Sequence, residues 1–146
     1  TKSRLTSGIF IPPASKSITN RVLLLAAMAD GRSIVKKPLF AEDTLLMIEV
    51  LKKLGVKIKA GRDTLEIISN GLDLPHSKEY SLYCGNAGTV ARFITAMTTT
   101  LSGSFLLEGT ERMHERPIGP LTESLLKLGC SIEHMQKDDT LPLKIN

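Results

Sequence analysis

The sequence contains few of the residues that build zinc sites, disulfide frameworks or aromatic binding surfaces. Its 146 residues include two cysteines, three histidines and no tryptophan, and aromatic residues make up 4%. Neither a CxxC nor a HExxH motif occurs, so we expect no metal site. The low aromatic content disfavours stacking on single-stranded nucleic acid, and we expect no nucleic-acid partner.

Long apolar runs are also missing. The longest covers residues 22–29, whereas a membrane-spanning helix needs about 20 apolar residues. We therefore expect no membrane segment, and no secretory signal is recognisable at the N-terminus. The first residue is Thr1 rather than Met, which suggests a chain that was processed, trimmed or cut from a longer polypeptide.

The charge balance is mildly basic. Lys and Arg number 19 against 15 Asp and Glu, a net charge of +4, and the basic residues are spread along the chain. A solvated surface explains most of this excess, and anionic ligands, small or polymeric, would explain the rest. With 42% hydrophobic residues, a chain of this length can form one domain with a real core.

Hydrophobic periodicity predicts a mixed α/β (α+β) fold. Helices are expected over residues 18–29, 42–54 and 121–128, and a further helix follows the tight turn at 84–89 and ends near 101. A polar loop is expected over 112–117. Strands are expected at 5–11, 33–36, 56–60, 64–68, 80–83, 104–108, 131–135 and 143–145.

The order of these elements recurs with an offset near 74 residues. Residues 51–58 (LKKLGVKI) align with 125–132 (LLKLGCSI), and five of the eight positions are identical. We interpret this as a β-α-β-α-β-β unit that occurs twice. In each copy the first helix starts at a segment whose residues suit ligand binding.

The first such segment covers residues 15–21. Ser17 or Thr19 can cap a helix whose free N–H groups and positive dipole end attract anions. Lys16 adds a mobile charge there, and Arg21 lies one helical turn beyond Ser17 on the same face. The spacing fits equally well a serine cap with two exposed basic side chains.

The second segment is the Gly-Asn-Ala-Gly-Thr turn at 85–89, with Arg92 in the helix that follows. Its small residues let backbone N–H groups approach a ligand closely, and Asn86 offers an amide. The pattern matches neither a Walker loop nor a GxGxxG motif. By itself it is also compatible with a simple turn.

The third segment, residues 112–117, contains Arg112, His114 and Arg116. Pro117 suits the first position of the next helix. Arg116 would then point at the positive end of that helix, which is unfavourable unless an anion binds there. A solvated charged loop is the alternative interpretation.

Taken together, the three motifs resemble the signatures of the 5-enolpyruvylshikimate-3-phosphate synthase family. The motifs are 13–21 (PASKSITNR), 85–89 (GNAGT) and 112–118 (RMHERPI), and the similarity extends from about Ile9 to Ile145. Ala14 and His114 depart from the usual pattern, and Phe93 stands where many bacterial members have proline.

The resemblance implies two domains, each built from three copies of the unit. This chain would hold part of the N-terminal domain: a hinge strand in residues 1–13, a first unit in 14–79 and a second in 80–146. The C-terminal domain would be its partner. The implied reaction transfers the enolpyruvyl group of phosphoenolpyruvate to the 5-hydroxyl of shikimate 3-phosphate and releases phosphate. It needs no metal or organic cofactor and takes place in the cytoplasm.

The resemblance also assigns roles to residues. Lys16 would contact both substrates and take part in proton transfer, and Ser17 and Arg21 would hold shikimate 3-phosphate. The residues implied for phosphoenolpyruvate are Lys16, Asn86, Gly88, Thr89 and Arg116. The position of Gly88 is also where the inhibitor glyphosate would be crowded by a methyl group. A fragment of this kind is expected to be inactive alone.

Three other functions remain open. The nearest is a relative of UDP-N-acetylglucosamine enolpyruvyl transferase. The others are a non-catalytic module that binds small anions, and a basic α/β domain that binds nucleic acid.

Overall fold

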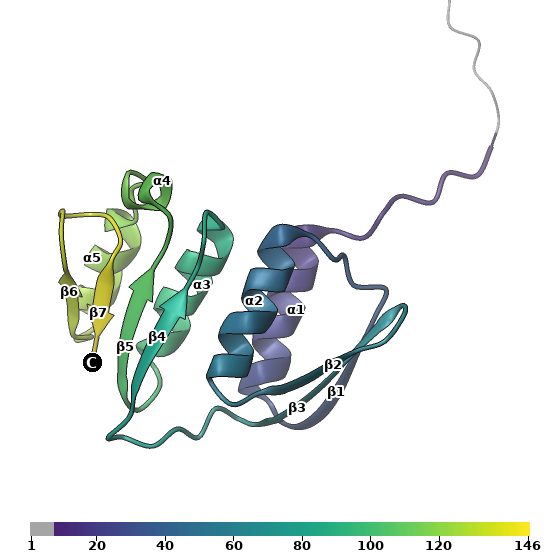
Figure 1. Ribbon diagram of the computed structural model, residues 1–146, viewed down its shortest axis with the longest axis horizontal. Coiled ribbons are helices and arrows are strands. Elements are labelled where there is room, and N and C mark those ends of the chain that lie inside the picture. Colours follow the sequence, from purple (N-terminus) through teal and green to yellow (C-terminus); the bar gives the residue numbers. More distant parts are fainter. Residues whose placement is uncertain (1–7) are drawn as a thin grey trace, which may run out of the picture.

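The computed structural model describes residues 8–146 (Figure 1). In the first half of the chain, two helices alternate with strands that form a sheet. These elements are α1 (Lys16–Met28), β1 (Asp30–Lys36), α2 (Glu42–Lys53), β2 (Lys57–Ala60) and β3 (Thr64–Asn70).

The second half has a similar order of elements and one additional short helix. Its elements are β4 (Glu79–Tyr83), α3 (Gly88–Thr98), β5 (Ser104–Glu108), α4 (Glu111–His114), α5 (Gly119–Lys127), β6 (Ile132–His134) and β7 (Leu143–Ile145).

The strands form two separate sheets. The first has the order β1-β3-β2, with both pairings antiparallel. The second has the order β4-β5-β7-β6, in which β4 and β5 are parallel and the other pairings are antiparallel. The sequence order β5, β6, β7 therefore forms the same arrangement as β1, β2, β3, and β4 is the added strand.

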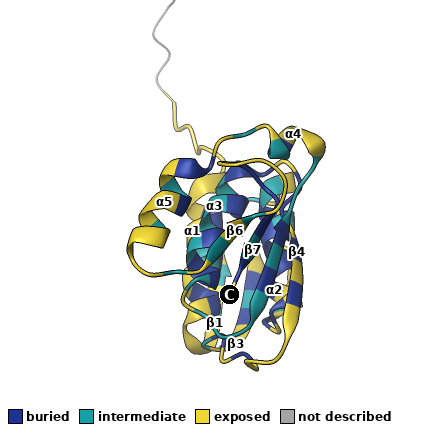
Figure 2. Ribbon diagram, turned by 90° about the vertical axis from the view of Figure 1, so that its left-hand side faces the viewer, coloured by how far each residue is buried: buried dark blue, intermediate teal, exposed yellow. Residues whose placement is uncertain are grey.

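The helices pack against the sheets and against one another. Residues of β3 alternate between buried and exposed, so that Leu65, Ile67 and Ser69 face inward, as expected for a sheet covered on one face. α2 contacts β2 in the first half of the chain and β4 in the second half, and α1, α2 and α3 are in mutual contact. In Figure 2 the outward surface of α5 is exposed, whereas β7 is largely buried. Helices α1 and α2 of the first half and α3 of the second half thus pack against one another in the interior.

The free edge of β4 is covered by a side chain. β4 pairs only with β5 in the described part of the chain. Lys53, at the end of α2, donates a hydrogen bond of 3.1 Å from Nζ to the carbonyl oxygen of Ser81 in β4. The C-terminal end of α2 is therefore tied to the edge of the second sheet.

Most of the predicted elements are confirmed, with shifts of a few residues at their ends. The strand predicted at 5–11 is wrong for residues 8–11, and residues 5–7 lie outside the described residues. Ile9, Phe10 and Ile11 are at least 82% exposed, and no described strand pairs with them. A single strand without a partner is not stable in water.

The polar loop predicted at 112–117 begins instead with the helical turn α4. Thr110 caps this turn, because its hydroxyl accepts a hydrogen bond from the Met113 N–H at 3.3 Å, and Met113 is buried. The following helix begins at Gly119 and carries Pro120 in its first turn, so the prediction that Pro117 starts it is wrong.

Candidate anion-binding site

The N-terminal ends of α1, α2 and α3 lie at the same end of the molecule (Figure 1). Each helix start has backbone N–H groups without helical partners and the positive end of the helix dipole. Two of the three sequence motifs supply the first turns of α1 and α3. The positive dipole ends of α1 and α3 therefore lie in one region, whereas the first turn of α2 carries Glu42 and Asp43.

The cap of α1 is Ser15 rather than Ser17 or Thr19. Its hydroxyl accepts a hydrogen bond from the Ile18 N–H at 3.3 Å, and the helix starts two residues earlier than predicted. Thr19 is buried and binds backbone instead: it donates to the Ser15 carbonyl at 2.9 Å and accepts from the Leu39 N–H at 3.1 Å. Ser17 is thereby left exposed in the first turn.

Arg21 connects the first motif with α3. Its Nη1 donates to the carbonyl oxygen of Ser17 at 3.1 Å and also contacts the Ser17 hydroxyl. Its guanidinium carbon lies 5.3 Å from the centre of the Phe93 ring in α3, a cation–π distance. The predicted pairing of Ser17 with Arg21 is present, and Phe93 helps to orient the arginine.

Lys16 forms an ion pair that the sequence motifs did not indicate. Its Nζ lies 3.1 Å from Oδ2 of Asp43 in the first turn of α2, and the two side chains are 49% and 22% exposed. The resemblance assigns no role to Asp43. The half-exposed ammonium of Lys16 remains accessible to a ligand.

No side chain caps the start of α3. Gly85 adopts a positive φ of 55° in the turn before it, and the N-cap residue Ala87 makes no side-chain cap hydrogen bond. The first N–H groups of α3, which include those of Gly88 and Thr89, therefore have no capping side chain. Asn86 is exposed beside them.

Arg116 lies against the start of α3. The sequence had predicted that it points at the start of the next helix, α5, and this prediction is wrong. Nη1 of Arg116 donates to the Asn86 carbonyl at 2.9 Å and approaches Asn86 Oδ1 at 3.5 Å. A Cβ atom at Gly88 would lie 2.5 Å from Arg116 Nη2. The positive helix end beside Arg116 is therefore that of α3.

Arg92 holds the Arg116 segment, residues 110–118, onto α3. Its Nη1 donates to the Gly88 carbonyl at 3.1 Å and its Nη2 to the Pro117 carbonyl at 2.6 Å. Arg92 was predicted to lie in the helix after the glycine turn, without a role of its own. Its position one turn after Gly88 was the available signal.

The arginines at this end are not neutralised within residues 8–146. The ion pairs within residues 8–146 join Lys16 to Asp43, Arg32 to Glu66 and Lys52 to Glu49. Arg21, Arg92 and Arg116 take part in none of these ion pairs. Two of the three arginines lie at the positive end of α3. Phosphate or carboxylate groups are the ligands that such an arrangement favours.

Cys84, just before the glycine turn, does not contribute a nucleophile. Burial raises the pKa of its thiol from 9.0 to about 12, so the thiol stays protonated near neutral pH. Residues 8–146 contain no group of three His, Cys, Asp or Glu side chains that could hold a metal ion. In the same range, no helix is long and apolar enough to cross a membrane.

The structure is thus a mixed α/β fold in which three arginines and the starts of α1, α2 and α3 gather at one end, an arrangement suited to anionic ligands. The family model described as EPSP synthase (3-phosphoshikimate 1-carboxyvinyltransferase) matches residues 1–146. The chain belongs to this family.

Relatives and solved structures agree with this assignment. The chain is 42% identical over 139 residues to a 3-phosphoshikimate 1-carboxyvinyltransferase from Paraburkholderia phymatum, covering 95% of this chain and 32% of the relative. It is 42% identical over 134 residues to the Cellvibrio japonicus protein of the same name, covering 91% and 31%. The solved EPSP synthase from Acinetobacter baumannii superposes with a TM-score of 0.84 at 27% identity, covering 95% and 32%. The chain thus spans about a third of the length of these proteins.

Proposed function

We propose that the chain is part of an enzyme that transfers the enolpyruvyl group of phosphoenolpyruvate to the 5-hydroxyl of shikimate 3-phosphate, releasing phosphate. Family membership supports the reaction. The observation that carries the proposal is the set of arginines without carboxylate partners at the helix starts. Both substrates are polyanions, and this end of the molecule is suited to bind them.

Shikimate 3-phosphate would bind at the start of α1. The Ser17 hydroxyl and the Arg21 guanidinium already contact each other, so one phosphate could accept hydrogen bonds from both. Phe93 limits the rotation of Arg21 by stacking on it. Lys16 would reach the same ligand from the first residue of the helix.

Phosphoenolpyruvate would bind at the start of α3. Gly88 and Thr89 would offer backbone N–H groups, Asn86 an amide, and Arg116 a charged clamp for the phosphate. The absence of a side chain at Gly88 leaves room for Arg116 to approach the helix start. These residues lie beside one another, as the hydrogen bond from Arg116 to Asn86 requires.

Lys16 is the residue proposed for proton transfer. The reaction needs a proton delivered to the vinyl carbon and another taken from the attacking hydroxyl. The Lys16 ammonium can donate, and Asp43 holds it at the junction of α1 and α2. The remaining acid–base groups, and closure of the site against water, would come from the C-terminal domain.

The proposed organisation of the chain is a repeat. Residues 14–79 and 80–146 would be two copies of one unit of the N-terminal domain, and residues 1–13 would precede them as a hinge. The matching strand orders β1-β3-β2 and β5-β7-β6 support this proposal. A module that binds anions without catalysis is the second candidate, because the chain spans only 32% of its relatives.

Phosphate release from both substrates tests the proposal. The 146-residue chain alone should show no turnover. Adding the remaining part of a family member as a complementing fragment should restore it, and Lys16→Ala should abolish the restored activity while Lys127→Ala should not. Turnover by the chain alone would show that it holds a complete site. Binding without restored turnover would support the non-catalytic module.

A further inference from the structure

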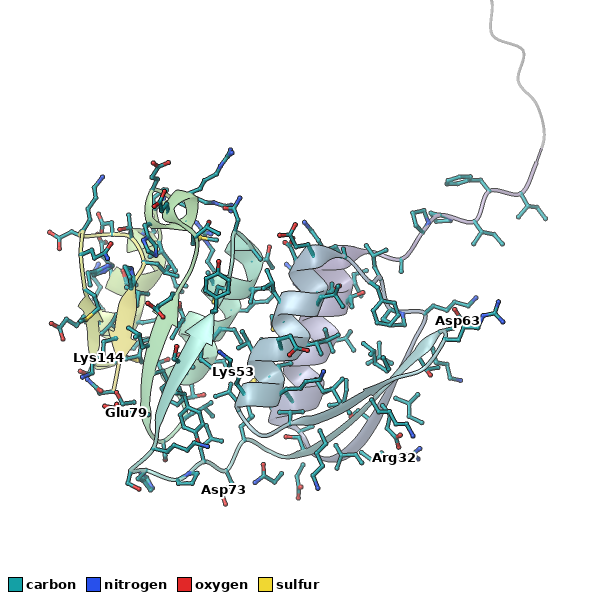
Figure 3. All side chains as sticks on the ribbon, viewed as in Figure 1. Arg32, Lys53, Asp63, Asp73, Glu79 and Lys144 are labelled. Carbon is teal, nitrogen blue, oxygen red and sulfur yellow. The ribbon has the colours of Figure 1, made fainter. Side chains whose placement is uncertain are left out.

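A cavity of about 450 Å³ lies where the two halves of the chain meet, at the C-terminal end of α2. It is lined from α2, β2, β3, the connection between β3 and β4, and the start of β4. Figure 3 labels Lys53 and Asp73 at this lower end of the molecule, far from the helix starts at the top. The cavity is therefore separate from the anion-binding site described above.

Three of the buried lining residues have large hydrophobic side chains. Leu54 and Leu74 are buried, and Tyr80 is 6% exposed. The Tyr80 ring stacks on Phe105, with ring centres 5.3 Å apart and planes inclined by 15°, so its orientation is fixed from behind. A cavity of this size with an apolar floor is typical of sites for small organic molecules.

Basic residues line the rim. Lys53, Lys57 and Lys78 are exposed around the floor, and Asp73 is the acidic residue among the lining side chains. None of the ion pairs in residues 8–146 involves these lysines. The Lys78 ammonium lies 4.8 Å from the centre of the Tyr80 ring. Three ammonium groups and one carboxylate give the lining a formal charge of +2.

We propose that this cavity binds a small molecule that combines an apolar ring with a dianionic group. The ring would lie on Leu54 and Leu74 beside the edge of Tyr80, whose faces are occupied by Phe105 and Lys78, and the anionic group would face the lysines. Two negative charges match the formal charge of the lining. The C-terminal end of α2 offers carbonyl groups and no free N–H donors, so recognition of the anion depends on the lysines.

The test uses the ¹⁵N-labelled 146-residue chain and phenyl phosphate, which carries close to two negative charges above pH about 7. Amide signals of residues 53–57, 69–75 and 78–80 should shift with increasing ligand. Inorganic phosphate and phenol serve as probes of the charge and of the ring separately. Each should shift the same signals much less than phenyl phosphate does.

Variants locate the site. Lys57→Gln combined with Lys78→Gln should weaken binding about fivefold, the effect of removing two exposed ion pairs. Lys127→Gln, outside the cavity, should leave the shifts of residues 53–57, 69–75 and 78–80 unchanged. Shifts confined to residues 16–21 and 86–89, or equal shifts with inorganic phosphate, would overturn the proposal. An equal weakening of binding in Lys127→Gln and in the double variant would also overturn it.

Discussion

Gly88 and Arg116 are in direct contact. A Cβ atom at Gly88 would lie 2.5 Å from Nη2 and 2.8 Å from Cζ of Arg116. Glycine is thus required here for the close approach of a guanidinium to a helix start, and not for an unusual backbone angle. The contacted atoms belong to the end of a flexible side chain, so a methyl group would move the arginine and leave the fold in place.

Gly88→Ala should therefore change binding more than stability. The methyl group displaces Arg116 from the start of α3, and phosphoenolpyruvate should bind more weakly. The free energy of unfolding should change by less than about 1 kcal/mol, because alanine is the better helix former. Titration by NMR and urea denaturation measure the two effects. Binding of shikimate 3-phosphate at α1 is the control. An equal loss for both ligands would indicate a folding defect, and the same variant in a complete enzyme should weaken glyphosate inhibition.

The ion pair between Lys16 and Asp43 should matter little for stability. Lys16 is half-exposed, and an exposed pair contributes no more than about 1 kcal/mol. Lys16→Met should leave urea denaturation nearly unchanged and remove phosphate-induced shifts in residues 16–21. Asp43→Asn should free the ammonium and strengthen phosphate binding. Weaker binding in Asp43→Asn would show that the aspartate orients Lys16 and does not compete for it.

Arg92 should act by holding the Arg116 segment in place. It bridges two backbone carbonyls, on Gly88 and Pro117, and the single ammonium of lysine does not reproduce the planar fork. Arg92→Lys should speed amide hydrogen exchange in residues 110–118 and weaken phosphoenolpyruvate binding. Arg112→Lys, on the same segment, is the matched control. Unchanged exchange in Arg92→Lys would mean that other contacts fix the segment.

Cys84 should make stability fall in alkaline solution. Burial raises the pKa of its thiol from 9.0 to about 12, so between these values the unfolded chain binds fewer protons than the folded one. Stability then decreases as pH rises, by on the order of 1 kcal/mol at pH 10. Urea denaturation at pH 8 and pH 10 should show this loss in the unmodified chain and not in Cys84→Ala. Equal losses in both chains would assign the effect to other groups.

The sequence was sufficient for the elements and for their order. Period-two alternation in β3 and glycine at the ends of α2 and α5 are local signals, so the helices and strands were placed to within a few residues. The strand at 8–11 failed because pairing depends on a neighbour that the local pattern does not contain. Met113 and Thr110 similarly form α4 through burial and capping, in a segment whose charges predicted a loop.

The sequence indicated candidate site residues but not the contacts between them. Ser17 and Arg21 were predicted one helical turn apart and are in contact, because spacing along a helix fixes which side chains are neighbours, but the helix starts at Lys16, two residues earlier than predicted. The contacts of Arg116 with α3, and of Lys16 with Asp43, join segments separated by about 30 residues in the chain. Such contacts follow from how the units pack, and a pattern within one segment carries no information on them.

The hydrogen bond from Lys53 to Ser81 bears on how the chain behaves at high concentration. An uncovered strand edge is a template on which another molecule can add a strand, and a lysine at the edge is a common obstacle to this addition. The bond at 3.1 Å occupies a carbonyl oxygen that an incoming strand would need. Protection of β4 therefore depends on α2 being folded. If α2 detaches transiently, the same lysine leaves the edge, and self-association would begin there before the rest of the chain unfolds.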